Sequence, residues 1–306
     1  MAVAEATAES LLTLREESRL SLIWRRFRRH RLAVLSGVVI LFFLIVALLA
    51  PLIAPYDPLA QDLKLKNAGP SREHLLGTDE LGRDTLSRLM YAARISLFVA
   101  FTVVLISETI GVIIGAISGF YGGWVDSLIQ RFVEFMLSLP TLPLLLALSA
   151  IFRDVTFPGL SREWSSAIVI VLVLTSLQWI TASRLVRGMV LSLREQEFTQ
   201  AARALGMSNM GIILRHMIPN AIAPVIVSAT LNLGGVIVVE SALSFLGFGI
   251  QPPIPTWGNM LQNVQNDMWT QPAKAFYPGL CIFLASLSFN YIGDGLRDAL
   301  DPRLKL

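Results

Sequence analysis

The chain of 306 residues is 54% apolar and only 15% charged, whereas soluble domains carry about a quarter charged residues. This composition excludes an intrinsically disordered chain and argues against a soluble enzyme, whose surface needs more charge. The formal net charge is +3, and the single cysteine, Cys281, excludes an internal disulfide or a cysteine-rich metal cluster.

Six apolar runs approach the roughly 20 residues of helix that cross a bilayer. The third contains Pro140 and Pro143, which predict a kink rather than a break because neighbouring helices can satisfy the freed carbonyls. We therefore predict an all-α, polytopic membrane protein with six transmembrane helices, and two buried helices of a soluble protein are the weaker alternative. The runs are 32–50, 95–119, 135–152, 164–183, 217–239 (resuming after Glu240 as far as Leu246) and 275–293.

Residues 1–31 are predicted to form a cytoplasmic arm that ends in the basic run WRRFRRHR. This run suits anionic lipid headgroups better than nucleic acid, because no aromatic platform or nucleic-acid-binding motif accompanies it. Residues 32–54 are predicted as an uncleaved first transmembrane helix, since the apolar run is longer than that of a signal peptide. With the N-terminus inside, the inner segments hold almost twice as many Lys and Arg residues as the outer ones. Both termini are therefore predicted to be cytoplasmic, with residues 297–306 as the C-terminal tail.

The external segment 55–94 is longer than a hairpin connection needs. Asp84 can cap a helix that starts at Thr85, and four apolar residues then follow at helical spacing. We expect a short interfacial helix before the second span, with a solvated connector as the alternative. The four residues are Leu86, Leu89, Met90 and Ala93.

The inner segment 184–219 is predicted to form a helix, a glycine turn and a second helix. Gly206 can adopt the positive φ that ends a helix, and Ser208 can cap the next one, which leads to Pro219 at the start of a new helix axis. Such a projection from a membrane domain is a candidate docking surface for a soluble partner. The first helix carries an apolar stripe of Phe198, Ala201, Ala202 and Leu205.

Three glutamates lie in or beside the predicted spans: Glu108, Glu240 and Glu134. A carboxylate facing lipid at the midplane costs several kcal/mol, so each is expected to face the bundle, a partner or water. Glu108 and Glu240 are candidates for a translocation path, and hydrogen-bonded contacts between helices are the alternative.

The second span also carries three glycines at four-residue spacing, Gly111, Gly115 and Gly119. This pattern predicts close helix packing rather than a conduit. The outer segment after the fifth span, FLGFGIQPPIPTWGNML, is predicted either to fold back toward the membrane or to cap a translocation path.

The inner segment resembles the EAA loop of binding-protein-dependent ABC importer permeases, in which Glu-Ala-Ala precedes a glycine and then Ile-x-Leu-Pro. Here it contains Gln200-Ala201-Ala202, then Gly206, then His216-Met217-Ile218-Pro219. The spacing fits throughout, although Gln200, His216 and Ile218 replace Glu, Ile and Leu. A salt bridge from position 200 is therefore not expected.

Three further stretches resemble the C-type permease subunit of dipeptide, oligopeptide and nickel importers: LLGTDELGRDTLSRLMYAARISL, SFLGFGIQPPIPTWGNML and GDGLRDALDPRLK. The resemblance implies a type I ABC importer transmembrane domain in the inner membrane, with a five-helix permease core at 95–296. It also implies a second, B-type permease, two ATPase subunits that bind ATP and Mg, and an external substrate-binding protein. The implied coupling residues are Phe198, Gln200, Ala201, Ala202, Leu205, Gly206 and Pro219.

No catalytic, cofactor or metal site is expected in this chain, which has no phosphate-binding GxxxxGK[ST] loop and no Ser/His or HExxH arrangement. The intramembrane glutamates leave an ion-coupled secondary transporter as the alternative function. The cargo is not identified, because peptides, nickel, glutathione-like compounds and some sugars all fit the resemblance.

Overall fold

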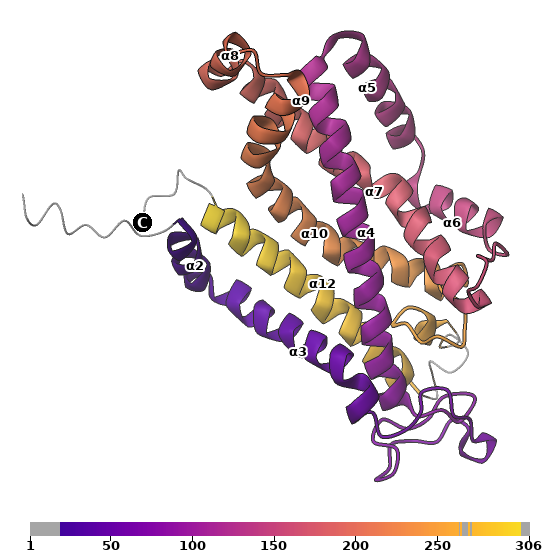
Figure 1. Cartoon of the computed structure of the whole chain (residues 1–306). Coiled ribbons are helices and arrows are strands. Elements are labelled where there is room, and N and C mark those ends of the chain that lie inside the picture. The colour runs from indigo at the N-terminus through magenta and orange to yellow at the C-terminus, as the bar shows by residue number, and fades with distance from the viewer. Residues whose placement is uncertain (1–18, 263, 265–268, 270, 301–306) are drawn as a thin grey trace, which may run out of the picture.

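A computed structural model describes residues 19–262, 264, 269 and 271–300. Residues 1–18 of the predicted arm and residues 301–306 of the predicted tail lie outside this part. Among the described residues, five helices are long and apolar enough to cross a membrane, and a bent pair makes six if it counts as one span. The five are α3 (Arg31–Ile53), α4 (Thr85–Tyr121), α7 (Arg162–Arg194), α10 (Ile218–Phe245, continuous with the turns before it) and α12 (Ala273–Leu300), as Figure 1 shows. The prediction of an all-α polytopic membrane protein is confirmed.

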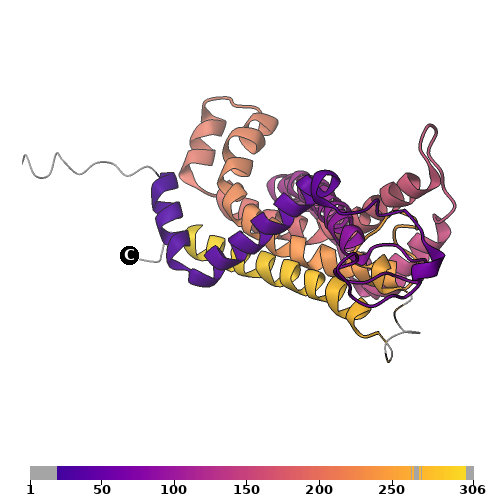
Figure 2. The same ribbon diagram turned by 90° about the horizontal axis from the view of Figure 1, so that it is seen from below.

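The first span, α3, lies along α12 and α4 at one side of the bundle (Figure 2). It follows a short basic helix, α2 (Arg19–Arg29), and His30 caps it by accepting the Ala33 N–H at Nδ1, 3.1 Å away. Only one narrow face of α3 is buried, and the other side chains are exposed and apolar, as lipid contact requires. The buried residues are Ala33, Ser36, Ile40, Phe43, Ala47 and Ala50.

The helix expected in the outer segment and the second span form one helix, α4, which corrects the expectation of a distinct interfacial helix. Asp84 does begin it, accepting the Ser87 N–H at 2.8 Å. Because neither glycine nor proline occurs between Thr85 and Ile110, nothing ends the helix at the membrane surface. The polar residues Ser87 and Arg88 are also buried, since the preceding loop folds over this turn.

The third predicted span, 135–152, consists of two helices, α5 (Gly123–Ser138) and α6 (Thr141–Ile151), bent by 91°. The prediction of a kink rather than a break is wrong. Leu139 is extended, with φ −86° and ψ 137°, because the ring of Pro140 disfavours a helical residue before it. The first helix also begins well before the predicted span, directly after α4.

Helices α4 and α7 pack with their backbones in contact through the predicted glycine ladder. A Cβ added to Gly111 would lie 2.6 Å from the Trp179 carbonyl oxygen, and one added to Gly115 would lie 2.3 Å from that of Ser183. Any side chain here would overlap α7. The prediction of close helix packing is therefore confirmed, and this contact organises the centre of the bundle.

The proline-rich segment after α10 folds back onto the C-terminal parts of α3 and α10 and the N-terminal part of α4. Its Trp257 is fully buried, donates its backbone N–H to Ser96 Oγ at 3.2 Å, and meets the Phe43 ring edge-on at 5.3 Å. Close contacts of Gly258 with Ser241 leave no room for a side chain at that position. Of the two expectations for this segment, the structure therefore bears out folding back.

Candidate functional site

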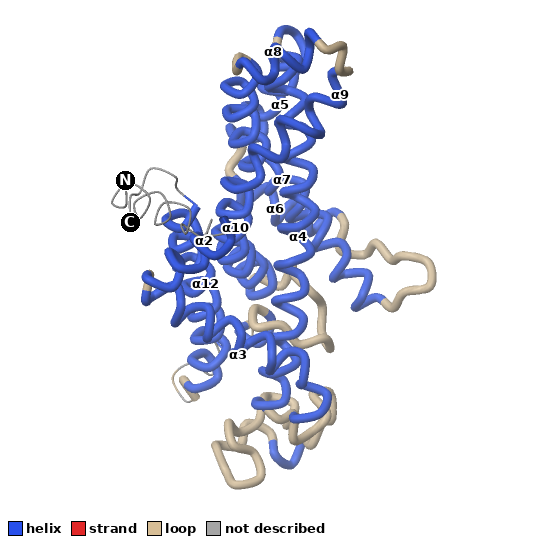
Figure 3. Tube along the Cα trace, turned by 60° about the vertical axis from the view of Figure 1, so that its left-hand side comes forward, coloured by secondary structure: helices blue, strands red, loops and turns tan. Residues whose placement is uncertain are grey.

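The predicted helix–glycine–helix projection lies at one end of the molecule, opposite the long loop between α3 and α4 (Figure 3). It consists of α8 (Glu197–Ala204), α9 (Asn209–Ile212) and a π-helical turn (Ile213–Met217) that leads into α10. Ser208 begins α9 as expected, its Oγ accepting the Gly211 N–H at 3.2 Å. Pro219 is the second residue of α10, which directly continues the π-helical turn.

Gly206 ends α8 in a left-handed conformation with φ +76°. The Gly206 N–H donates to the Arg203 carbonyl at 2.9 Å, and the Met207 N–H donates to the Ala202 carbonyl at 3.0 Å. This pair of bonds is the Schellman arrangement, which satisfies the last carbonyls of a helix. The turn thereby fixes the angle between α8 and α9.

The four residues of the apolar stripe on α8 lie in different environments. Ala202 is only 5% exposed and faces the rest of the chain, whereas Leu205 is 87% exposed at the tip of the helix. Ala201 is exposed, and the half-exposed Phe198 ring contacts His216 with centroids 6.0 Å apart. Gln200 is exposed and donates to the Glu195 carbonyl. The outward apolar surface of the projection is therefore formed by Phe198, Ala201, Leu205 and Met210.

The side of the projection that faces the rest of the chain belongs to a hydrophobic cluster, which also contains the adjacent ends of α4, α7 and α10. Arg203 adds a contact between α8 and α4, with its guanidinium carbon 5.3 Å from the Phe120 ring centroid. A force applied to α8 therefore acts on three spans through packed side chains. The buried members of the cluster are Ala116, Phe120, Val186, Val190, Ala202, Ile212, Ile213, Met217, Ala221 and Val225.

An ion pair joins α5 to α7 beside this cluster. Asp126 accepts two hydrogen bonds from Arg187, from Nε to Oδ1 and from a terminal nitrogen to Oδ2, both 2.6 Å. Ser118 of α4 donates to the same carboxylate, and Arg194 donates to the carbonyls of Gly119 and Phe120 at the end of α4. Bidentate arginine–carboxylate geometry is strong and directional, so this joint fixes α5 relative to the C-terminal parts of α4 and α7.

Replacing Arg187 by leucine is expected to destabilise the protein by about 1.5–3 kcal/mol, because a mostly buried carboxylate loses two charge-assisted hydrogen bonds. Exchanging the charges, with Asp126→Arg and Arg187→Asp together, is expected to recover part of that loss. Thermal unfolding of the purified protein measures both effects. The control is Arg162→Leu, which breaks an exposed pair with Asp154 and is expected to change little. An equal loss of stability in Arg187→Leu and Arg162→Leu would show that the Asp126–Arg187 pair does not hold α5 in place.

The three candidate glutamates lie in different surroundings. Glu108 is buried in α4, and its Oε1 accepts a hydrogen bond from Asn232 Nδ2 of α10 at 2.7 Å. Asn232 in turn lines a groove of about 570 Å³ beside α7, α10 and α12. Glu240 is buried near the C-terminal end of α10, accepts from Ser244 at 2.7 Å and lines none of the described cavities. Glu134 is exposed on α5.

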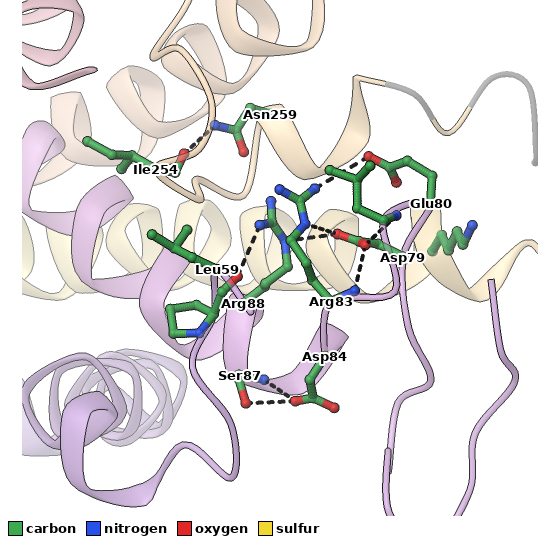
Figure 4. A network of polar contacts seen from close by, with 12 residues as sticks. Leu59, Asp79, Glu80, Arg83, Asp84, Ser87, Arg88, Ile254 and Asn259 are labelled. Atoms are coloured by element: carbon green, nitrogen blue, oxygen red, sulfur yellow. Dashed lines mark hydrogen bonds and ion pairs between the residues drawn. The ribbon is translucent and has the colours of Figure 1, made fainter. Parts of the chain in front are cut away.

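A second polar cluster joins the loop before α4 to the first turns of that helix (Figure 4). Asp79 pairs with Arg83 at 2.7 Å and with Arg88 at 3.3 Å, and Arg88 also donates to the Pro58 carbonyl. These contacts attach the loop before α4, including the turn Leu63–Leu65, to the first turns of that helix. Within the described residues no group of three or more His, Cys, Asp or Glu side chains could hold a metal ion.

Sequence reasoning missed the Asp126–Arg187 joint, because the two residues lie 61 positions apart and neither belongs to a motif. The available signal was the scarcity of charge. An aspartate and an arginine at the ends of apolar helices need partners in the membrane. Arg131, Arg184 and Arg194 offered Asp126 the same charge, so the sequence did not identify Arg187 as the partner.

Comparison with known proteins agrees with this architecture. The family described as the binding-protein-dependent transport system inner membrane component matches residues 111–306, and the N-terminal TM domain of oligopeptide transport permease C matches residues 18–70. A dipeptide transport system permease protein of Alkalihalophilus pseudofirmus is 41% identical over 282 residues, covering 92% of this chain and 89% of that protein. A glutathione transport system permease protein of Pectobacterium atrosepticum is 39% identical over 283 residues, covering 92% and 90%. The chain therefore belongs to the family of inner-membrane components of binding-protein-dependent transport systems, and it is a multi-pass permease component of an ABC importer.

Proposed function

We propose that this chain forms the translocation path of an ATP-driven importer together with a second, B-type permease. In this proposal α8 is the coupling helix that docks onto one of two cytoplasmic ATPase subunits, and an external binding protein delivers the cargo at the opposite end. The cargo we propose is a dipeptide or a related peptide-like solute, because similar chains are named for dipeptide and glutathione transport. ATP and Mg would be bound by the ATPase subunits.

The observation that carries this proposal is the two-sided construction of the α8–α9 projection. Its outward side exposes Leu205 and other apolar groups, which are typical of a site where a soluble partner binds. Its inward side is packed onto three spans by the cluster around Ala202 and Phe120. A partner that moves the outward side would therefore move the ends of the spans, as switching between two conformations of an importer requires.

The proposed orientation places both termini and α8 in the cytoplasm. The Lys and Arg excess supports this orientation. The start of α3 and the end of α12 also lie close together, as expected of two ends on the same side of a membrane. Gly295, near the end of α12, approaches Ala33, near the start of α3, so closely that an added Cβ would lie 2.4 Å from the Ala33 Cβ. The two termini would then leave the same side of the membrane.

The alternative is an ion-coupled transporter that uses the intramembrane glutamates, and it predicts gradient-driven uptake by this chain alone. Our proposal predicts the opposite. Vesicles containing this chain alone are expected to take up no dipeptide under a proton or sodium gradient, whereas vesicles with the partner permease, both ATPases and the binding protein are expected to do so with ATP. Glu108→Gln is expected to leave ATP-driven uptake largely intact, because glutamine keeps an oxygen that accepts from Asn232. Radiolabelled dipeptide uptake measures each case, and gradient-driven uptake by the chain alone would favour the alternative.

A further inference from the structure

Two open grooves lie side by side on the inner half of the bundle. One, of about 570 Å³, is formed by α7, α10 and α12, and the other, of about 430 Å³, by α5 and α7. They are contiguous, because Thr181 and Leu185 of α7 line both. Each volume lies within the range of small-molecule sites, about 300–1,000 Å³.

Each groove has an arginine at its edge. Arg184 lines the smaller groove and Arg297 the larger. Both side chains are exposed, and within the described residues neither has an ion-pair partner within 4.0 Å. Arg187 also lines the smaller groove, but Asp126 neutralises it. Arg184 directly follows the apolar run 164–183, and an arginine at that position reaches the aqueous interface. Its guanidinium can therefore meet water or an anionic solute at the inner mouth of the groove.

The rest of the lining is largely uncharged. Asn232 and Ser228 provide polar groups, and the carboxylate of Glu108, which accepts from Asn232, is buried and does not line the groove. The two acids of the neighbouring helix turn, Asp294 and Asp298, do not line the groove. The remaining lining residues are apolar: Leu185, Ala223, Pro224, Val227, Leu231 and Leu300.

We propose that this double groove is a binding site on the inner half of the translocation path for solutes that carry a free carboxylate, as an unmodified dipeptide does. Arg184 and Arg297 receive the carboxylate, since a guanidinium offers it two parallel hydrogen bonds, and the apolar lining contacts the rest of the solute. Cationic solutes are repelled by the same two groups. The proposal rests on the proposed import function and adds the chemical class of the cargo and two residues that select it.

Thiol labelling tests whether the groove is wet and attracts anions. In a Cys281→Ala background, Leu185→Cys places one thiol between the grooves of the assembled transporter in inside-out vesicles. The labelling rates of two methanethiosulfonates are compared, one with an anionic sulfonate and one with a cationic trimethylammonium group. The ratio of the anionic to the cationic rate is divided by the same ratio measured with a small thiol in solution. We expect the ratio to favour the anionic reagent by about tenfold, as local fields raise the rates of counter-ions. Arg184→Gln with Arg297→Gln should remove most of this preference, and Arg131→Gln, an exposed arginine of α5 outside the groove, should keep it.

Protection by cargo analogues tests the ligand class. Dialanine, which has a free carboxylate, is expected to slow the labelling of Leu185→Cys at least about threefold more than dialanine amide, and this difference should vanish in Arg184→Gln. Absent labelling, equal rates for both reagents after normalisation, or equal protection by the two dipeptides would each overturn the proposal. Labelling needs neither ATP nor the binding protein, so its failure would leave the proposed coupling role of α8 standing.

Discussion

Leu205→Asp is expected to abolish ATP-driven uptake while leaving the amount of the chain in the membrane unchanged. The side chain is 87% exposed at the tip of α8, so the fold does not depend on it. If α8 docks into an apolar site on an ATPase subunit, an aspartate would enter that site without a partner, and losing a central contact costs about 2 kcal/mol or more. That is roughly a thirtyfold loss of affinity. Uptake and the quantity of ATPase that co-purifies with the tagged chain measure both consequences.

Two further variants separate docking from folding. Leu63→Asp adds the same charge at an exposed leucine in the outer loop, and it is expected to transport normally. Ala202→Asp is expected to lower the amount of folded protein, because Ala202 is buried in the inner cluster and an unpaired buried carboxylate is costly. Its loss of transport would therefore say little about docking. Normal uptake by Leu205→Asp would show that α8 is not the coupling element.

The features that could be predicted from the sequence are those that local chemistry determines. Apolar runs without charge place the spans, because no other segment can enter the hydrocarbon. Gly206 ends α8 as predicted, since only glycine adopts that backbone conformation without strain. The glycine ladder in α4 indicated a close helix contact, but spacing alone did not name α7 as the neighbour.

The features that escaped prediction depend on residues distant in the sequence or on a missing signal. Two of these features depend on where a helix ends. They are the bend between α5 and α6 and the single long α4. Pro140 was predicted to kink the helix, because membrane proteins can satisfy the carbonyl that proline leaves without a hydrogen bond. Whether they do so depends on the neighbouring helices. In the candidate site, the helical spacing predicted one apolar stripe. It did not separate the inward Ala202 from the outward Leu205, because that division depends on where α4 and α10 end.

Gly115→Leu is expected to prevent the bundle from folding. The position faces the α7 backbone, and even a Cβ would lie 2.3 Å from the carbonyl oxygen and 3.0 Å from the carbonyl carbon of Ser183. Neither group can rotate away, so relief requires separating α4 from α7 along their whole contact. Overpacking by a few carbons costs about 1–3 kcal/mol where flexible side chains can yield, and a backbone contact should exceed that range. Against a total stability of about 5–15 kcal/mol, little folded protein should remain.

Graded and matched substitutions identify the cause. Gly115→Ala adds only the Cβ and should give a smaller loss than leucine, measured as the melting temperature in detergent and the amount of protein in the membrane. Gly37→Leu makes the same change in α3, where an added Cβ meets nothing within 4 Å. Glycine is about 0.8–1 kcal/mol less favourable in a helix than alanine, and leucine ranks just below alanine, so this control should be neutral or slightly stabilising. If the two leucine variants melted alike, close α4–α7 contact would not be what organises the bundle. If only Gly115→Leu fails, the small residues are required by the neighbouring backbone rather than by any conduit along the helix.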